Sequence, residues 1–377
     1  MTYDVVLLPG DGIGPEVVEA AVRVLDAVRE SEGFEVKYTS LLAGGAAIDA
    51  HSTPLRAEDL ERCRRADAIL LGAVGGPDWD HLPVETRPER ALLRLRSELG
   101  LGINLRPVAW TAAGGRHAPL TEDVARDTDI AFVRELTGGV YFGQPSFYDR
   151  TPGARHAVDT ATYSEEQVEA VLEFAFRLAR SRRGKVTSVD KANVMNTSRL
   201  WREVATDYGR RNRDVELEHA LVDSFAMSLM QSPRSYDVVV TENLFGDILT
   251  DLAGVIAGSL GVLPSASLRP RSAERRFGLY EPIHGSAPSL RGQNVANPVG
   301  CILSVALMLQ WSFDRPASAE SIRSAVRTVM AKGRLTADLA GPGATSLGTS
   351  EFTDAVIEVL QEQGGTGGRR DLRHHVA

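Results

Sequence analysis

The feature that most constrains the fold is an alternation of short, mostly apolar runs with longer helical patterns. The runs occupy residues 5–8, 68–71, 130–133, 186–189 and 238–241. Helical patterns, such as residues 164–182, lie between them. Strands that alternate with helices build a mostly parallel sheet, and ligands of such sheets gather at the carboxyl ends of the strands. The sequence therefore predicts an α/β fold with its site at that edge.

Length and composition narrow the class further. The chain has 377 residues, which suits two α/β lobes better than one small core. Its hydrophobic content of 43% and charged content of 24% are those of an ordinary globular protein. The formal net charge of −8 argues against nucleic acid as a partner, because phosphate binding needs a basic surface. Small anions remain possible, since they need only a local group of arginines.

Targeting and membrane signals are not visible. Cys63 and Cys301 make neither a metal-ligand spacing nor a disulfide framework, so a reducing compartment is expected. The N-terminus lacks a basic segment before its short apolar run, and the apolar stretch 301–309 is too short to cross a bilayer. We expect a cytoplasmic protein with no membrane partner and with a flexible tail at residues 364–377.

The segment TENLFGDILTD, residues 241–251, places Asp247 and Asp251 four residues apart. On a helix this spacing puts two like charges on one face, which destabilises the helix unless something positive lies between them. A solvated acidic face is the simpler explanation of such a pair alone. The surrounding leucine, isoleucine and phenylalanine residues favour a partly buried setting, in which a divalent cation with oxygen ligands is the natural partner.

Three arginines and two proton carriers follow predicted strands or loops. Arg96, Arg106 and Arg134 could hold a small polycarboxylate through bidentate contacts, although each alone is more often structural. Lys191 follows the run 186–189, and Tyr141 lies in the glycine-flanked segment GGVYFG, so both could transfer protons. An ion-paired lysine and a packed tyrosine are the alternatives.

Two glycine-rich segments indicate ligand loops. The turn at residues 10–15, GDGIGP, lacks the last glycine of the dinucleotide fingerprint and carries a proline at the helix start. A tight turn near a ligand explains it equally well. Residues 277–298 are glycine-rich and polar and precede an apolar helix, which suits phosphate or ribose contacts through free backbone N–H groups.

Taken in order, these motifs resemble the isocitrate/isopropylmalate family of β-decarboxylating dehydrogenases. The resemblance runs from LLPGDGIGPEV to GTSEFTDAV and includes LLGAVGGPDWD, NLRP, RELTGGVYFG, SVDKANV, NLFGDILTD and EPIHGSAP. It implies a two-domain α/β fold with a mostly parallel sheet that is not of the Rossmann type. Residues 1–102 with 256–363 would form the cofactor-side domain, and residues 103–255 a second domain with a dimerisation arm.

The resemblance also implies an activity. It predicts NAD-dependent oxidative decarboxylation of (2R,3S)-3-isopropylmalate to 4-methyl-2-oxopentanoate and CO₂ in leucine biosynthesis, with Mg²⁺ or Mn²⁺, in a homodimer with shared active sites. The alternative is a sibling enzyme acting on tartrate, malate or another 3-alkylmalate, for example in secondary metabolism. A metal-dependent lyase or prenyl transferase would need a second acid-rich motif, which the sequence lacks. A non-catalytic subunit would not need the proton carriers and the aspartates.

Each motif position carries a role that the resemblance implies. Arg96, Arg106 and Arg134 match the clamp on the malate carboxylates, Tyr141 the acid that protonates the enol, and Lys191 the base for the substrate hydroxyl. The metal ligands would be Asp247 and Asp251 with the partner subunit's Asp223, which also contacts substrate. The isopropyl pocket would be lined by Glu89, Leu92, Leu93 and the partner subunit's Val194. Cofactor contacts are expected from Gly76, Glu89, His284, Gly285, Ser286, Ala287, Pro288, Ser289 and Asn297.

Two positions depart from the family pattern. NAD-using relatives usually read HGSAPDI, whereas this chain reads HGSAPSL, with Ser289 in place of the aspartate and Arg291 two residues on. This removes both an anchor for the ribose of NAD and a repulsion against the 2′-phosphate of NADP. NAD is the first choice, because the lysine–tyrosine pair of NADP-using isocitrate enzymes is missing, and NADP is the alternative. Glu242 replaces a small residue, and the sequence offers no physical reason for it.

Overall fold

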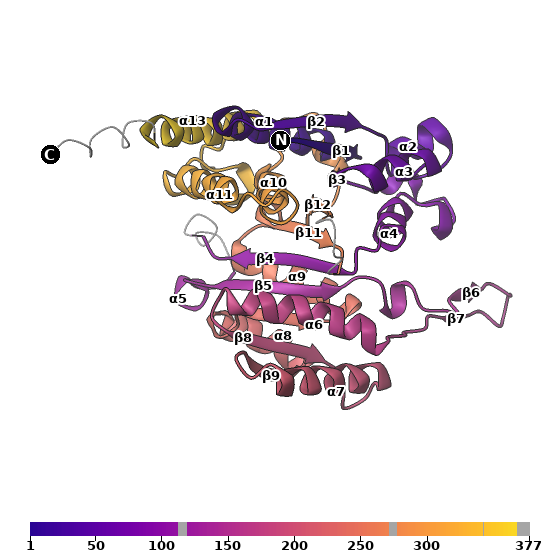
Figure 1. The fold of residues 1–377 in the computed structure, drawn as a ribbon. Helices are drawn as coiled ribbons and strands as arrows, with labels where there is room; N and C mark the ends of the chain where they lie inside the picture. The colour runs from indigo at the N-terminus through magenta and orange to yellow at the C-terminus, as the bar shows by residue number, and fades with distance from the viewer. Residues whose placement is uncertain (112–118, 271–276, 342, 368–377) are drawn as a thin grey trace.

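The computed structural model describes residues 1–111, 119–270, 277–341 and 343–367, and ten strands of this part form one twisted sheet (Figure 1). Across the sheet the strands are β2 (Glu35–Ser40), β1 (Thr2–Gly10), β3 (Ala68–Ala73), β12 (Gly278–Pro282), β11 (Pro264–Leu268), β4 (Ile103–Ala109), β5 (Asp129–Glu135), β10 (Val238–Thr241), β8 (Lys185–Asp190) and β9 (Glu216–Leu221). Neighbours are parallel except for the pairs β12–β11, β11–β4 and β4–β5. The predicted α/β class with a mostly parallel sheet is confirmed.

The middle of the sheet joins two halves from different parts of the chain. The dividing line runs between β11 and β4. The first half consists of β2, β1, β3, β12 and β11, and the second half consists of β4, β5, β10, β8 and β9. The predicted boundaries agree with this division: residues 1–102 with 256–363 contain five strands of the sheet, and residues 103–255 contain the other five. That each half is a separate domain stays a prediction.

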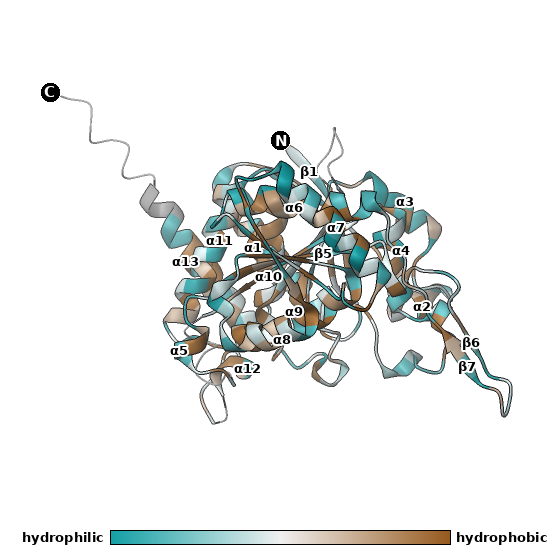
Figure 2. Ribbon diagram, turned by 90° about the horizontal axis from the view of Figure 1, so that it is seen from below, coloured by the Kyte–Doolittle hydropathy of each residue, from teal (hydrophilic) through white to brown (hydrophobic). Residues whose placement is uncertain are grey.

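The first half is covered by seven helices of the described part of the chain. They are α1 (Gly14–Glu32), α2 (Gly45–His51), α3 (Ala57–Arg65), α4 (Glu89–Glu98), α10 (Val299–Trp311), α11 (Pro316–Ala331) and α13 (Thr349–Gly367). Helix α1 has Pro15 in its first turn and ends at Gly33, whose φ of 70° suits a glycine cap. Helix α10 is apolar on nearly every side because it packs between α1, α11 and the strands β11 and β12. Figure 2 shows apolar residues gathered in the interior and hydrophilic ones along the outer helices.

The second half carries α6 (Glu165–Arg180), α7 (Asn196–Arg211), α8 (Val222–Gln231) and α9 (Asn243–Ala257), with the short α5 (Glu122–Ala125). Helix α6 begins with a capping box in which Ser164 Oγ accepts from the Gln167 N–H at 3.3 Å and Gln167 Oε1 accepts from the Ser164 N–H at 2.9 Å. Helix α9 follows β10 directly, so its first turn lies at the carboxyl edge of the sheet.

A two-stranded hairpin, β6 (Phe147–Asp149) and β7 (His156–Val158), projects from the body of the molecule (Figure 1). In the part of the chain that the structure describes, its strands pair only with each other, and the side chains of Phe147 and Tyr148 are exposed. The short α12 (Ala337–Ala340) precedes the last helix.

Helix α13 extends to Gly367, so the first four residues of the expected tail are helical, and residues 368–377 lie outside the described part. In the described ranges no helix is both long and apolar enough to span a membrane.

Candidate active site

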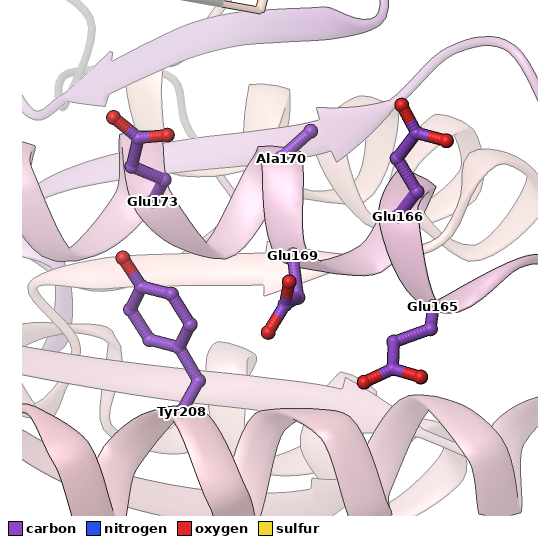
Figure 3. A pocket seen from close by; sticks show the side chains of 6 residues that line it. All are labelled: Glu165, Glu166, Glu169, Ala170, Glu173 and Tyr208. Atoms are coloured by element: carbon purple, nitrogen blue, oxygen red, sulfur yellow. The ribbon is translucent and has the colours of Figure 1, made fainter.

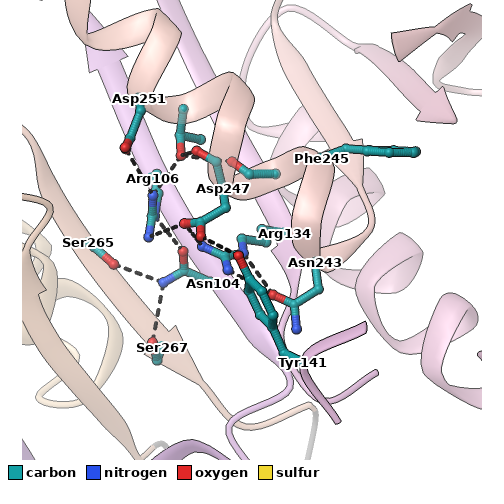
Figure 4. Close-up of polar contacts among 12 residues, drawn as sticks. Asn104, Arg106, Arg134, Tyr141, Asn243, Phe245, Asp247, Asp251, Ser265 and Ser267 are labelled. Atoms are coloured by element: carbon teal, nitrogen blue, oxygen red, sulfur yellow. Dashed lines mark hydrogen bonds and ion pairs between the residues drawn. The ribbon is translucent and has the colours of Figure 1, made fainter. Parts of the chain in front are cut away.

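Asp247 lies at the centre of a polar cluster at the carboxyl edge of the sheet (Figure 4). Arg134 Nη1 donates to its Oδ1 at 2.5 Å, and the Tyr141 hydroxyl donates to its Oδ2 at 2.8 Å. Arg106 Nη2 lies 3.7 Å from Oδ1. Burial opposes ionisation of Asp247, but Arg134 and Arg106 together lower the pKa of its carboxyl group below the usual value.

Arg106 lies between the two aspartates of the 241–251 segment. Its Nη1 is 3.8 Å from Asp251 Oδ1, while its Nη2 faces Asp247. The repulsion between carboxylates four residues apart on α9 is therefore relieved by a guanidinium group of the same chain. Asp251 is more exposed than Asp247, and burial is the main cause of the rise in its pKa.

Arg106 is held in place from two sides. Its Nε donates to Asn104 Oδ1 at 2.8 Å, and its Nη1 donates to Thr250 Oγ1 at 2.6 Å. Asn104 Nδ2 in turn donates to Ser265 Oγ at 2.8 Å and to Ser267 Oγ at 3.2 Å (Figure 4). These bonds cross the β11–β4 pair, so the guanidinium is fixed relative to both halves of the sheet.

Arg134, at the end of β5, is 1% exposed. Its Nε and Nη2 both donate to Asn243 Oδ1, at 3.0 and 2.8 Å, and Asn243 Nδ2 donates to the carbonyl of Gly138 at 3.0 Å. Burial lowers the pKa of Arg134, and Asp247 opposes that effect. The planar fork of the arginine is therefore aligned before any ligand arrives.

Arg96 comes from the last turn of α4, in the other half. Its Nη2 donates to Glu281 Oε1 of β12 at 3.0 Å, and both side chains are buried. Its Nε is buried and has no hydrogen-bond partner among the residues described. Besides burial and Arg134, the charge of Arg96 contributes to lowering the pKa of Arg106, so the three predicted arginines lie close enough to interact. A buried, unpaired donor beside two further cations suits an anionic ligand.

Leu92 and Leu93 lie one turn before Arg96 on α4 and are half-buried. Their positions, three and four residues before Arg96, place them on the same face of the helix as the arginine. Glu89, the first residue of α4, lies close to Gly75: a Cβ on Gly75 would be 2.6 Å from Glu89 Oε1. An apolar surface and a carboxylate thus border Arg96 on one helix.

Lys191 and Asp223 form a separate pair at the ends of β8 and β9. Lys191 Nζ donates to Asp223 Oδ1 at 2.6 Å, and this bond lowers the pKa of Asp223. Val194 lies one turn further on and is 64% exposed. Within the described ranges, no three acidic, histidine or cysteine side chains are grouped to hold a metal ion. One chain therefore does not gather Asp223 with Asp247 and Asp251.

The turn at residues 10–14 packs against the loop that follows β12. The Ile13 N–H donates to the carbonyl of Ser286 at 2.8 Å, and a Cβ on Gly12, whose φ is 58°, would lie 1.9 Å from that oxygen. The glycines therefore permit a close approach between two backbone segments. The structure shows a tight turn packed against the loop after β12, and that a ligand binds beside it stays a prediction.

The loop from His284 to Ser289 is the candidate cofactor segment. His284 Nε2 is buried and has no hydrogen-bond partner in the described part of the chain, whereas a Cβ on Gly285 would meet only open space. Asn297 anchors the far end of the segment: its Oδ1 accepts from the Val299 N–H at 3.0 Å and its Nδ2 donates to Asp338 at 2.9 Å. A polar atom without a partner beside open space fits a nucleotide.

The remaining cofactor candidates surround this loop. Gly76 has a φ of 154°, and a Cβ there would lie 3.5 Å from the ring of Pro288, so the loop after β3 touches the loop after β12. Ala287 has a left-handed φ of 39°, and Ser289 is exposed in a short 3₁₀ turn. The structure thus brings the predicted cofactor residues of two loops side by side.

Several polar residues of the site lie inside the quoted motifs but were given no role there. Asn104 belongs to NLRP, and Asn243 and Thr250 belong to NLFGDILTD, but only the folded chain shows that they hold the arginines. Asn104 shares a strand with Arg106 two positions on, which is the one local hint. The unexplained Glu242 is the N-cap of α9, where its Oε1 accepts from the Phe245 N–H at 2.6 Å.

A hollow between α6 and α7 is a different kind of surface (Figure 3). It is lined by Glu165, Glu166, Glu169, Glu173 and Tyr208, with Ala170. Four carboxylates would repel an anionic substrate, so this hollow does not compete with the arginine cluster as a site for a polycarboxylate.

Comparison with known proteins points to one group. The isocitrate/isopropylmalate dehydrogenase family matches residues 4–356. The 3-isopropylmalate dehydrogenase of Heyndrickxia coagulans is 52% identical over 360 residues, which is 96% of this chain and 97% of that protein. That of Aquifex aeolicus is 47% identical over 359 residues, covering 95% of this chain and 97% of its own length.

Solved structures agree with the fold. The crystal structure of isocitrate dehydrogenase from Methylococcus capsulatus has a TM-score of 0.83 at 32% identity and covers 95% of this chain and 99% of its own. A β-decarboxylating dehydrogenase from Thermococcus kodakarensis, in its apo form, has a TM-score of 0.77 at 35% identity, with coverage of 97% and 98%. The similarity extends over both halves of the sheet.

Proposed function

The chain belongs to the isocitrate/isopropylmalate dehydrogenase family, and from this premise we propose that it oxidises and decarboxylates 3-isopropylmalate in leucine biosynthesis. The relatives named 3-isopropylmalate dehydrogenase, at about 50% identity over nearly the whole chain, support this substrate. The observation that carries the proposal is the cluster in which two buried arginines and Tyr141 converge on Asp247.

Three fixed arginines bind the two carboxylates of the substrate. Arg96, Arg106 and Arg134 are each held by a buried polar partner, so little side-chain freedom is lost when the ligand binds. The unpaired Nε of Arg96 supplies one donor directly.

Substrate choice follows from the face of α4 that carries Leu92 and Leu93. These side chains suit an isopropyl group and offer no partner to a third carboxylate. A carboxymethyl group in that place would be buried without a counter-charge, so isocitrate is rejected.

Proton transfer is divided between two residues. Burial, and then the bond to Asp247, raises the pKa of Tyr141 to about 12, so the phenol keeps its proton at neutral pH and can deliver it to an enol. Lys191 of a second copy takes the proton from the substrate hydroxyl. In each chain Asp223 holds that lysine at 2.6 Å.

The metal would be Mg²⁺ or Mn²⁺. Asp247 and Asp251 offer hard oxygen ligands on one helix face, and the partner subunit's Asp223 adds the third. A divalent cation there supplies the positive charge that makes an alcohol more acidic and an enolate more stable.

The site is therefore completed in a homodimer. Helices α8 and α9 pack together and expose Met227 and Ile248, which are 57% and 59% exposed, and Val194 is similarly exposed. Large apolar side chains exposed on adjacent helices indicate a surface that a second copy covers. The projecting β6–β7 hairpin, with exposed Phe147 and Tyr148, is a further candidate contact.

The cofactor would be NAD, bound along the His284–Ser289 loop, with NADP as the alternative. Ser289 is exposed and uncharged, so it neither anchors a ribose as a carboxylate does nor repels a 2′-phosphate. Arg291 lies two residues further along the same loop.

Initial rates with racemic 3-isopropylmalate and Mg²⁺, measured with NAD and NADP in parallel, test the proposal. We expect turnover with NAD, and none with isocitrate. Turnover with NADP alone would make Ser289 and Arg291 the cofactor determinants. A well-folded dimer that turns over tartrate, malate or another 3-alkylmalate, but not isopropylmalate, would overturn the substrate assignment.

In the same assay Lys191→Ala should abolish turnover and leave the dimer intact, and substantial residual activity would contradict its role as base.

A further inference from the structure

Tyr163, which precedes α6, has no role in the chemistry described so far. Its hydroxyl donates to Glu242 Oε2 at 2.9 Å and accepts from the backbone N–H of Asn243 at 3.0 Å. Both partners belong to the start of α9, the helix that carries Asp247. One hydroxyl therefore satisfies two groups at the first turn of that helix.

The other side of Tyr163 faces the turn that carries Tyr141, the 3₁₀ turn η4 (Gly139–Tyr141). A Cβ on Gly138 would lie 2.5 Å from a ring carbon of Tyr163, and a Cβ on Gly139 would lie 2.5 Å from its hydroxyl oxygen. Gly139 has a φ of 76°, and its N–H donates to the carbonyl of Thr162 at 3.0 Å. The backbone of this turn thus rests directly on Tyr163.

Tyr163 therefore lies between the turn that carries Tyr141 and the first turn of α9, the helix that carries Asp247. Asn243 links them a second time, because its Nδ2 donates to Gly138 and its Oδ1 accepts from Arg134. The 2.8 Å distance between the Tyr141 hydroxyl and Asp247 depends on the spacing of the turn and the helix. Tyr163 is in contact with both.

The ring of Tyr163 is itself supported. It meets the ring of Trp201 edge to face, with centroids 5.9 Å apart, and the Trp201 Nε1 donates to Ser188 Oγ at 3.1 Å. Trp201 is buried. Removing only the hydroxyl of Tyr163 should therefore leave the ring in place.

We propose that Tyr163, held by Glu242, is a positioning residue that fixes the turn of Tyr141 against the first turn of α9. This inference rests on the proposed function, in which Tyr141 delivers a proton. It also gives Glu242 a second task besides capping α9: its Oε1 accepts from the helix and its Oε2 from the tyrosine. If a proton donor is displaced by a fraction of an ångström, proton transfer slows although the donor group itself is still present.

The kinetic test compares Tyr163→Phe with the wild type and with Tyr38→Phe. Tyr38 is the matched control, since its hydroxyl also donates to a carboxylate, Asp26 Oδ1 at 2.8 Å, but from β2 in the other half. We expect Tyr163→Phe to lower kcat about tenfold or more and to change KM for isopropylmalate less than twofold. In a Tyr141→Phe background the same substitution should lower kcat no further. A kcat within twofold of the wild type, or an equal loss in both backgrounds, would overturn the proposal.

Hydrogen exchange provides a readout that needs no substrate. The amides of residues 138–143 and 243–246 should exchange about tenfold faster in Tyr163→Phe, and at the wild-type rate in Tyr38→Phe. Unchanged exchange would refute the positioning role whatever the substrate is. Faster exchange in an enzyme that does not oxidise isopropylmalate would refute the proposed function alone.

Discussion

At the residue scale, the site depends on charges that are paired before substrate arrives. Arg134 is 1% exposed and donates to Asn243 and Asp247 through three nitrogens. A lysine in its place keeps the charge but presents one compact ammonium group instead of a planar fork. For Arg134→Lys we expect a loss of about 100-fold in kcat/KM and of about 2 kcal/mol in the free energy of unfolding. Steady-state kinetics and urea unfolding measure the two effects.

The control for that experiment is Arg126→Lys. Arg126 pairs with Glu122 four residues away on an exposed surface. Solvent screens such an exposed pair, so this variant should be indistinguishable from the wild type. If both variants lost stability equally, the burial argument for Arg134 would be wrong.

The cysteines give a second prediction at this scale. Cys63 and Cys301 are both fully buried, and burial raises the pKa of both thiols, that of Cys63 to about 12. A thiol is reactive only as a thiolate, so neither should react with a disulfide reagent at pH 8 in the native protein. In urea both should react at once. Rapid labelling of either one before unfolding would contradict the buried assignment.

Contacts between residues close in the sequence could be predicted, whereas contacts between residues far apart along the chain could not. Asp247 and Asp251 are four residues apart, and their shared helix face was visible from the spacing alone. Tyr163 and Glu242 are separated by 79 positions, and no local pattern relates them. The motifs thus identified the groups expected to do chemistry, whereas the groups that hold them became visible only in the folded chain.

At the scale of elements, Asp11 joins three segments of the first half of the sheet. Its carboxylate is 5% exposed and accepts from the N–H groups of Gly45, Ala46 and Gly75, each at 2.8 Å. These bonds tie the turn after β1 to the start of α2 and to the loop after β3. That last loop holds Gly76, one of the expected cofactor contacts.

Replacing Asp11 by asparagine leaves one acceptor oxygen for three donors. We expect Asp11→Asn to weaken NAD binding at least tenfold and to change isopropylmalate binding much less, because the arginine clamp lies elsewhere. Calorimetric titration of each ligand measures this directly. Asp26→Asn is the control, as Asp26 accepts from the side chains of Arg29 and Tyr38 and, among the described residues, bonds no backbone N–H of another segment. Equal weakening of both ligands would indicate general loosening of the fold instead.

The predicted strands agree with the structure in their cores and fall short at their ends, as in β1, expected at residues 5–8 and observed at Thr2–Gly10. Strand β11 (Pro264–Leu268) is not among the predicted strands, because PSASL is short, begins with proline and is not strongly apolar. It is a strand because β12 and β4 bind it on both sides. Tertiary context outweighs propensity there.

At the scale of the whole molecule, the exposed apolar side chains of α8 and α9 predict a dimer. Met227→Lys should weaken it, because a charge would be buried against the second copy without a partner. Light scattering after size exclusion should then show a larger monomer fraction, with unchanged circular dichroism. Val84→Lys is the control, since Val84 is 63% exposed in the segment between β3 and α4. A wild-type protein that is monomeric at micromolar concentration would contradict the dimer.

The order of strands in the sheet could not be read from the residues themselves. The alternation of strands and helices fixed the class, and only the family resemblance indicated that the chain returns to its first half after residue 255. Apolar pattern says that β3 is buried on both faces, but it does not say that β12 will be its neighbour. That pairing joins Ala68 to Gly278.

The pairing of β3 with β12 has a consequence for synthesis. All six residues of β3 are buried in the finished sheet, yet β12 follows it by roughly 200 residues. At a typical translation rate that interval is on the order of 10–40 s. During this interval β3 is an apolar strand with one unpaired edge, and such an edge can pair with a strand of another chain. The late arrival of β12 therefore makes the ribosome-bound chain, rather than the folded enzyme, the form most in need of a chaperone.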